Sequence, residues 1–325
     1  MIPLPFPPSQ NRRMEAELVA AGGGVPDVSV IVPTYRPNRV WLAECLKSIE
    51  VAAQAIPEWT FEFLVVDDGC PHGTAQYLLP EFPMWRLLVQ ENRGLAAARN
   101  LGISASRGRW LHFVDDDDRL ESAFYKAVAA AVRDQTSSIV YGNWTYFTHQ
   151  YQTKRTSPNA MTASRMLPCG NCFPVNAVVV QAELVKHLGG FNSAFKAMED
   201  WDVWLRCVRF GATLTHAPEA WAEVRIQPYS MSTRQAAMHG WMTQVCEQES
   251  QFADTWIEKG TSLKRFAASW GIYLMRSDRL QKGWGSWWAF GRARWGAKWM
   301  FLAAGCLAHV LLRKNRSPHA TLLDP

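Results

Sequence analysis

Four consecutive carboxylates, Asp115 to Asp118, directly follow the apolar run Trp110–Val114. Ionised carboxylates this close repel one another, so they need a cation or several hydrogen-bond donors nearby. If the chain stays extended, side chains two residues apart point the same way, so that Asp115 and Asp117 converge. Two such hard oxygen ligands suit Mg²⁺ or Mn²⁺ shared with a substrate diphosphate. The alternative is a solvated acidic turn at the start of a helix over 119–133.

A second acidic pair, Asp67-Asp68, precedes Gly69 and follows the apolar run Phe61–Val66. Asp-Gly is also a common turn, which is the alternative interpretation of this segment. If both apolar runs are strands of one parallel sheet, the two acidic groups share a crevice at the carboxyl ends of the strands. Such a polar crevice can hold a nucleoside by its base and its ribose hydroxyls.

A third acidic pair, Glu199-Asp200, begins a segment with tryptophans at helical spacing. A carboxylate held against tryptophan rings has a raised pKa and can serve as a general base. The alternative is a pair of acids that the helix dipole favours at a helix N-terminus, with Asp202 and Arg206 forming an ion pair one turn apart.

Strand and helix patterns alternate from residue 28 to about residue 135, which predicts a parallel sheet with crossover helices. Runs of apolar and β-branched residues predict four strands, at Val28–Val32, Phe61–Val66, Trp85–Val89 and Trp110–Val114. Apolar residues three and four apart from Leu42 to Ile49 predict a helix with one apolar face, and the alanine-rich Leu95–Ser106 predicts a second. The acidic groups then lie at strand ends, where ligands bind in open α/β sheets.

The remainder of the chain is more mixed. It predicts strands at Ile139–Phe147, Ala177–Val180 and Ala222–Ile226, a helix at Glu199–Phe210, and only helices beyond Ser232. We expect three regions: a flexible N-terminal segment over 1–26, a catalytic domain over 27–235, and a helical, tryptophan-rich basic region over 236–325. The catalytic domain is expected to divide into a nucleotide-binding half over 27–118 and an acceptor half over 119–235.

The composition is that of a soluble globular protein. Of the 325 residues, 48% are hydrophobic and 19% charged, which excludes wholesale disorder and a polytopic membrane protein. The net charge of +5 is too small to indicate nucleic-acid binding. Seven scattered cysteines, an odd number, favour a reducing compartment. Because no apolar run resembles a secretory signal or is long enough to span a membrane, we expect a cytoplasmic protein.

The basic charge is concentrated near the C-terminus. Lys259 to Arg316 has a net charge of +11, so the rest of the chain is acidic. Five of the 16 tryptophans lie between Trp284 and Trp299, among and before basic residues. This pattern predicts that residues 284–316 contact an anionic membrane surface, at the inner face of the cell membrane. The alternative is a helical cap that packs onto the catalytic domain or onto the second subunit of a homodimer.

Six short segments occur in a fixed order along the chain. They are Val28–Tyr35, Leu64–Gly69, Asn92–Asn100, Phe113–Asp118, Gly189–Asn192 and Glu199–Arg206. In this order, over about residues 27 to 232, they resemble the family 2 glycosyltransferases of the GT-A fold. The resemblance implies an α/β fold with a Rossmann-like, mostly parallel sheet flanked by helices, followed here by a helical C-terminal extension.

The resemblance also implies an activity and a set of site residues. The activity is an inverting transfer of a sugar from a nucleotide-diphosphate donor to a hydroxyl of a glycan or lipid-linked acceptor, as in bacterial surface polysaccharide synthesis. The resemblance implies that the nucleotide pocket is lined by Pro33, Thr34 and Tyr35, with Asp68 in contact with the base and Asp116 near the ribose. Arg99 would orient the donor. Mn²⁺ or Mg²⁺ would be held by Asp115 and Asp117, and Asp200 would be the general base.

One departure from the family pattern lies at Gln227. Members with a Glu-Asp-Trp motif often continue to an Arg-x-His segment, where this chain has Arg225-Ile226-Gln227. Glutamine does not match histidine as a metal ligand, so a GT-A protein that binds nucleotide sugars with little catalysis stays an alternative. A sugar nucleotidyltransferase is another, but it needs a glycine-rich basic loop after the first strand, where this chain has Pro33–Pro37.

Overall fold

The computed structural model describes residues 24–132, 136–227 and 235–261. These residues form two compact units. Within the described ranges, the first unit contains residues 24–163 and 172–227, and the second contains residues 164–171 and 235–261. Nearly all of the predicted N-terminal segment and the tryptophan-rich part of the C-terminal region lie outside the described residues.

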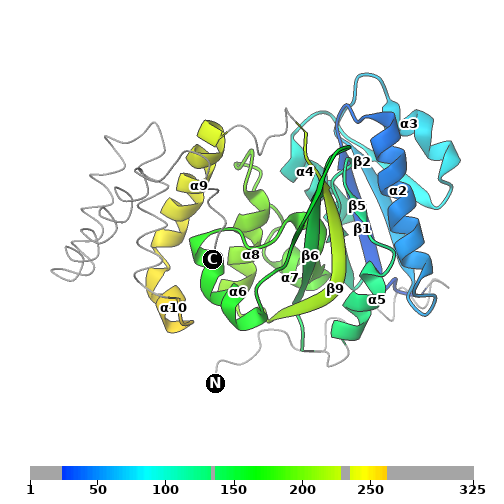
Figure 1. Cartoon of the computed structure of the whole chain (residues 1–325). Coiled ribbons are helices and arrows are strands. Elements are labelled where there is room, and N and C mark those ends of the chain that lie inside the picture. The colour runs from blue at the N-terminus through cyan, green and yellow to red at the C-terminus, as the bar shows by residue number, and fades with distance from the viewer. Residues whose placement is uncertain (1–23, 133–135, 228–234, 262–325) are drawn as a thin grey trace. The chain divides into compact units, whose positions relative to one another are not determined.

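The first unit is built on a sheet that has nine strands within the described ranges, in the order β3-β2-β1-β4-β8-β6-β9-β5, with β7 paired to β6 (Figure 1). The strands are β1 (Val28–Thr34), β2 (Phe61–Asp67), β3 (Trp85–Val89), β4 (Trp110–Phe113), β5 (Arg119–Leu120), β6 (Ile139–Phe147), β7 (Gln152–Arg155), β8 (Val178–Gln181) and β9 (Leu214–Arg225). Strands β1 to β4 pair in parallel, β8 is antiparallel to β4 and β6, and β9 is parallel to β6.

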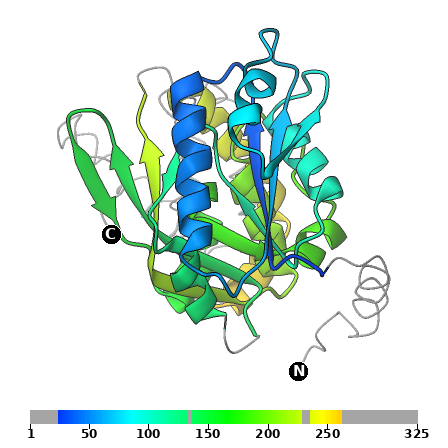
Figure 2. The same cartoon turned by 90° about the vertical axis from the view of Figure 1, so that its right-hand side faces the viewer.

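Helices cover both faces of this sheet. The helices of the first unit include α2 (Arg39–Gln54), α3 (Thr74–Leu78), α4 (Leu95–Ala105), α5 (Phe124–Ala131), α7 (Ala182–His187) and α8 (Glu199–Arg209). Helices α2 and α5 lie on one face, and α4, α7 and α8 lie on the other (Figures 1 and 2). The predicted α/β class, with a mostly parallel sheet flanked by helices, is therefore confirmed.

Helix α2 illustrates why these residues form these elements. The side chain of Asn38 accepts hydrogen bonds from the backbone N–H groups of Val40 and Trp41, at 3.0 and 3.3 Å, and so caps the helix N-terminus. The predicted apolar face is confirmed, because Leu42, Cys45, Leu46 and Ile49 are all buried. This face packs on the sheet beside strand β1, which is buried along its whole length.

Helix α4 approaches β1 from the other face at close range. A Cβ atom on Gly102 would lie 2.4 Å from Cγ2 of Ile31, a distance that no side chain could accept without movement. Glycine at this position therefore lets the two elements touch. The close contact fixes the height of α4 above the sheet, and with it the position of Arg99 one turn earlier in the helix.

The sequence prediction was wrong about the start of the helix after the acidic run. Residues 119 and 120 form strand β5, and the helix begins only at Phe124. Arg119 and Leu120 pair with Glu223 and Ala222 of β9, and Arg119 Nε donates to Glu223 Oε2 at 2.9 Å. This pairing spans about a hundred residues of sequence, so local periodicity could not indicate it.

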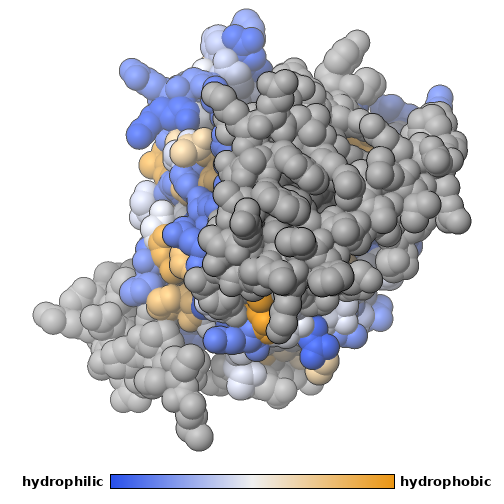
Figure 3. Space-filling view, turned by 90° about the vertical axis from the view of Figure 1, so that its left-hand side faces the viewer, coloured by the Kyte–Doolittle hydropathy of each residue, from blue (hydrophilic) through white to orange (hydrophobic). Residues whose placement is uncertain are grey.

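The second unit contains the helices α9 (Gln235–Ser250) and α10 (Ala253–Glu258). Trp256 is buried there, and its indole N–H donates to the carboxylate of Glu249 at 2.9 Å. None of the described helices combines the length and the apolar character that crossing a membrane requires. Figure 3 shows that on one side of the molecule the described hydrophobic residues form small groups among hydrophilic ones.

Candidate active site

The acidic run forms a turn directly after β4. The strand ends at Phe113, and the backbone N–H of Asp118 donates to the carbonyl of Asp115 at 3.1 Å. The carboxylates therefore spread around a turn and do not alternate along an extended strand. Asp118 is buried and accepts from the backbone N–H of Arg225 at 2.6 Å and from the side-chain amide of Asn176. Burial, then the neighbouring Asp117 and Asp115, raise its pKa well above the ordinary value.

Arg99 of helix α4 holds the side chain of Asp115 in the acidic turn. Arg99 is 1% exposed, and its guanidinium donates to Asp115 at 2.7 Å and to Glu199 at 2.5 Å. Burial alone would lower the pKa of Arg99, but Asp115, Glu199 and Asp200 together raise it, so it stays charged. Arg99 thus joins the acidic turn to the Glu199-Asp200 pair. The donor-orienting role of Arg99 stays a prediction, and the structure shows its contacts with Asp115 and Glu199.

Asp116 faces the end of β1. Thr34 Oγ1 donates to Asp116 Oδ2 at 2.5 Å. The pKa of Asp116 is raised to about 7, mainly by burial and also by Asp117 and Asp115, against the lowering effect of the hydrogen bond from Thr34. Thr34 and Pro33 are buried at this strand end, whereas Tyr35 is 43% exposed, with the guanidinium of Arg36 5.2 Å from its ring centroid. Of the predicted nucleotide-lining residues, Thr34 therefore contacts the predicted ribose-binding residue Asp116 directly.

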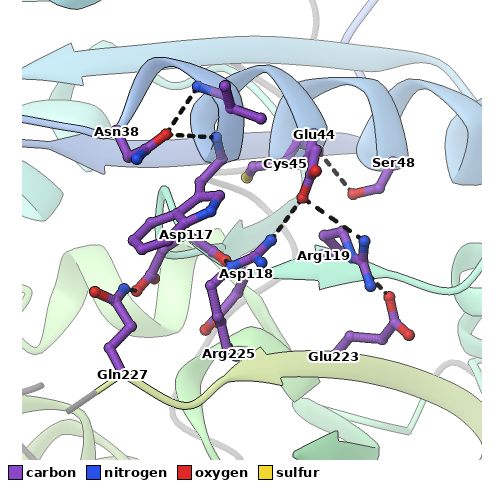
Figure 4. Close-up of polar contacts among 12 residues, drawn as sticks. Asn38, Glu44, Cys45, Ser48, Asp117, Asp118, Arg119, Glu223, Arg225 and Gln227 are labelled. Carbon is purple, nitrogen blue, oxygen red and sulfur yellow. Dashed lines mark hydrogen bonds and ion pairs between the residues drawn. The ribbon is translucent and has the colours of Figure 1, made fainter. Parts of the chain in front are cut away.

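Asp117 is held from the end of β9 (Figure 4). Arg225 Nε donates to its backbone carbonyl at 2.8 Å, and the side-chain amide of Gln227 donates to its Oδ2. Burial and Asp115 raise the pKa of Asp117 to about 6, against the lowering effects of hydrogen bonds and of Arg225. Asp115 and Asp117 are therefore close enough to repel each other.

Asp68 organises the loop after β3. Its two carboxylate oxygens accept from the side chain of Gln90 at 2.6 Å and from the backbone N–H groups of Arg93 and Gly94 at 2.9 and 2.8 Å. Its own N–H donates to the carbonyl of Thr34 at 2.9 Å, so it lies beside the nucleotide-lining residues. Gly69 follows with φ +76°, and a Cβ there would lie 2.7 Å from the backbone nitrogen of Asn92.

The Glu199-Asp200 pair opens helix α8 after a strained residue. Met198 has φ +64°, a left-handed conformation that is unfavourable for a non-glycine side chain and that often marks functional sites. Asp200 Oδ1 accepts from the backbone N–H of Trp201 at 2.7 Å. The predicted ion pair between Asp202 and Arg206 is present at 2.9 Å, which supports the helix-start interpretation for these two residues, and the general-base role of Asp200 stays a prediction.

Two amides that the sequence analysis missed hold these parts together. Asn176, 1% exposed, donates to Asp118, and its carbonyl contacts the ring of His112 at 2.8 Å. Asn100 of α4 makes two hydrogen bonds of 2.8 Å with the backbone of Phe191. Asn176 lies in a segment without a readable pattern, and no sequence signal could have found it. Asn100, by contrast, lies in one of the six segments singled out above.

The donor set fits a divalent cation only in part. No three His, Cys, Asp or Glu side chains of the described residues are grouped to hold a metal by themselves. Asp115 and Asp117, however, offer hard oxygens from two mutually repelling carboxylates, which is the charge arrangement that a cation relieves. The residues therefore fit a Mg²⁺ or Mn²⁺ whose coordination a diphosphate completes.

Comparisons with known proteins identify the domain. Residues 29–183 match the model of the family described as Glycosyl transferase family 2. An uncharacterized glycosyltransferase of Haemophilus influenzae is 27% identical over 191 residues, which are 56% of this chain and 62% of that protein. The uncharacterized glycosyltransferase EpsJ of Bacillus subtilis is 32% identical over 147 residues, 44% of this chain and 40% of that protein. The matches thus span 40% and 62% of these relatives.

Solved structures show the same fold. S. aureus TarS 1-349 in complex with UDP-GlcNAc superposes with a TM-score of 0.57 at 18% identity, over 77% of this chain and 81% of that chain. The mannosyltransferase PcManGT from Pyrobaculum calidifontis, in complex with GDP-Man and Mn²⁺, superposes with a TM-score of 0.54 at 18% identity, over 90% of this chain and 81% of that chain. Residues 29–183 therefore match family 2 glycosyltransferases, and the chain has the GT-A fold.

Proposed function

We propose that this protein is an inverting, metal-dependent glycosyltransferase that moves a sugar from a nucleotide-diphosphate donor to an acceptor hydroxyl. One observation carries the proposal: buried Arg99 joins the acidic turn after β4 to the Glu199-Asp200 pair of α8, within a family 2 domain. The buried guanidinium of Arg99 then connects the proposed donor site to the proposed base. The nucleotide sugars bound to TarS and PcManGT support the choice of donor class.

The nucleotide binds at the ends of β1 and β2 in this proposal. Pro33, Thr34 and Tyr35 line its pocket, and Asp116 receives a ribose hydroxyl beside Thr34. Asp68 lies next to Thr34 and contacts the base while it holds the loop over residues 90–94. Strand ends of this kind are where open α/β sheets bind ligands.

Asp115 and Asp117 would hold Mn²⁺ or Mg²⁺ together with the donor diphosphate. The cation supplies charge neutralisation for the diphosphate as it leaves. Arg99 fixes one carboxylate of the pair at 2.7 Å, and Arg225 fixes the backbone of the other at 2.8 Å. Both ligands are therefore oriented before a donor arrives, which reduces the cost of binding it.

Asp200 would accept the proton of the acceptor hydroxyl. The oxygen then attacks the anomeric carbon from the face opposite the diphosphate, and this geometry inverts the anomeric centre. Arg99 is close enough to Asp200 for the carboxylate to affect the pKa of the guanidinium, so the base lies near the acidic turn. That position is consistent with an acceptor entering on the α8 side.

The acceptor is proposed to be a glycan or a lipid-linked glycan of a bacterial surface polysaccharide pathway. The basic, tryptophan-rich residues 284–316, which lie outside the described residues, would hold the protein at the inner face of the cell membrane where such acceptors are presented. We also propose the division into a catalytic domain over 27–235 and a C-terminal region over 236–325.

Two variants test the proposed roles. Asp117→Asn should stay folded and lose more than about tenfold in donor turnover, an effect above ~1.4 kcal/mol on the barrier. Asp200→Asn should lose turnover but keep its nucleotide affinity, because the base contacts only the acceptor side. The measurement is hydrolysis of a panel of nucleotide sugars with Mn²⁺, alongside calorimetric titration with UDP and GDP. A nucleotide-binding protein that hydrolyses no donor would favour the binding-protein alternative instead.

A further inference from the structure

Gln227 occupies one of the two carboxylate oxygens of Asp117, a proposed metal ligand. Its side-chain Nε2 donates to Oδ2 of Asp117, from just beyond the end of β9 (Figure 4). A divalent cation binds a carboxylate oxygen at about 2.0 to 2.2 Å, and an N–H group pointing at the same oxygen repels it. A cation that uses this oxygen must therefore displace the Gln227 amide.

Arg225, two residues before Gln227, is held by contacts that do not involve the Gln227 amide. The Arg225 N–H donates to Asp118 at 2.6 Å, and its side chain donates to the Asp117 carbonyl at 2.8 Å and to Glu44 at 2.6 Å. Its guanidinium also lies 5.0 Å from the ring centroid of Trp41. Gln227 lies two residues further on, beyond the end of β9, so displacing its amide breaks none of these contacts.

The other candidate metal ligand has no displaceable partner. Asp115 accepts from Arg99, whose buried guanidinium also pairs with Glu199 and would be left uncompensated if it moved. The amide of Gln227 is neutral and half-buried, and water can replace its hydrogen bond at little cost. Of the two carboxylates, only Asp117 can exchange its side-chain partner for a cation.

We propose that Gln227 is a displaceable cap that holds Asp117 in the metal-free protein and competes with the cation for it. This inference rests on the proposed metal-dependent function. The cap keeps the carboxylate oriented by hydrogen bonding until a nucleotide and a cation arrive together. Gln227 thereby sets the metal affinity of the donor site without contacting the donor itself.

The test is Mn²⁺ binding to the full chain, measured by the loss of the free Mn²⁺ electron paramagnetic resonance signal in saturating UDP or GDP. Gln227→Ala should bind Mn²⁺ about three- to tenfold more tightly, because no hydrogen bond to the charged carboxylate has to be broken first. The metal-free variant should also melt at a lower temperature. Ile226→Ala, at the neighbouring exposed position, is the matched control and should match the wild type in Mn²⁺ affinity.

The possible results distinguish a failure of the Gln227 proposal from a failure of the proposed metal-dependent function. Equal or weaker Mn²⁺ binding by Gln227→Ala, with wild-type binding intact, overturns the cap and leaves the metal-dependent function standing. A wild-type chain that binds UDP or GDP but no Mn²⁺ overturns the metal dependence, and the cap with it. Circular dichroism of each variant confirms that the fold is retained.

Discussion

At the scale of single residues, buried charge pairing decides where this site can be rigid. Arg99 and Glu199 are almost completely buried, and together with Asp115 they form a chain of alternating charge. A buried pair of this kind costs desolvation, but removing one partner leaves an uncompensated charge that costs more. Rigidity at Asp115 therefore follows from burial, whereas Asp117 is held by a neutral amide.

We predict that Arg99→Met lowers the free energy of unfolding by about 3 to 5 kcal/mol, because Glu199 and Asp115 lose the buried cation that they share. The matched control is Arg107→Met. Arg107 also contacts a buried carboxylate, Glu62, at 2.9 Å, but its side chain is 56% exposed, so its loss should cost at most about 1 kcal/mol. The measurement is urea unfolding of both variants. An equal loss of unfolding free energy in the two would contradict the special role of Arg99.

Sequence patterns predicted the acidic residues of the site better than their partners. Asp115 to Asp118 are visible because four like charges end an apolar run, and that signal is local. Arg225 contacts Glu44, 181 residues away, and Asn176 contacts Asp118, 58 residues away. The sequence around Asn176 and Glu44 contains no pattern that would identify either residue as part of the candidate site. Side chains that complete a site from distant segments become visible only when the sheet order is known.

At the scale of elements, the end of β4 is supported from behind by an uncharged histidine. His112 is fully buried between Tyr125 of α5, whose hydroxyl lies 2.8 Å from Nδ1, and the carbonyl of Asn176, 2.8 Å from Nε2. A carbonyl can only accept, so Nε2 carries the proton and Nδ1 accepts from the tyrosine. Burial lowers the pKa of His112 to about 4, against a smaller raising effect of the bond to Asn176.

We predict an acid-sensitive contribution to stability from His112. Between pH 6.5 and about 4 the unfolded chain binds a proton that the folded chain does not, so this contribution is lost as the pH falls through that range. Between pH 7 and 5 the loss should be about 2 kcal/mol, at about 1.4 kcal/mol per unit. Denaturant unfolding of wild type and His112→Gln at several pH values measures it.

The variant should show a correspondingly weaker decline toward low pH. The raised pKa values of Asp116 and Asp117 act in the opposite direction, since the folded chain holds their protons more tightly. Both proteins share those carboxylates, so the difference between their pH profiles isolates His112. Parallel profiles would show that the histidine is charged or solvated in the folded state.

Strands and helices could be predicted from the sequence where a strand is buried on both faces of the sheet. Strands β1 and β2 lie between helices on both faces, and so their sequences are continuous apolar runs with clear ends. Strand β5 consists of two residues, Arg119 and Leu120, whose extended form depends on Glu223 and Ala222 across the sheet. The sequence therefore predicted the parallel half of the sheet well and missed the short antiparallel addition.

At the scale of the whole molecule, the distribution of charge suggests where the protein works. The region from Lys259 to Arg316 carries +11, and the remainder of the chain is acidic. Basic side chains placed among tryptophans gain energy at an anionic lipid surface, where each contributes about 1 kcal/mol, while the acidic remainder is repelled. We predict that this separation of charge orients the protein at a membrane surface.

We predict that the full chain floats with vesicles containing anionic lipid and that salt weakens the interaction. Replacing Arg292, Arg294 and Lys298 with glutamine should reduce binding by roughly 3 kcal/mol at low ionic strength, since each basic residue near the surface contributes about 1 kcal/mol. The matched control replaces Lys47, Lys126 and Lys154 of the catalytic domain, with the same change in net charge. Equal loss in both triple variants, or binding indifferent to anionic lipid, would favour packing or dimerisation, because only a membrane-facing cluster makes the effect depend on position.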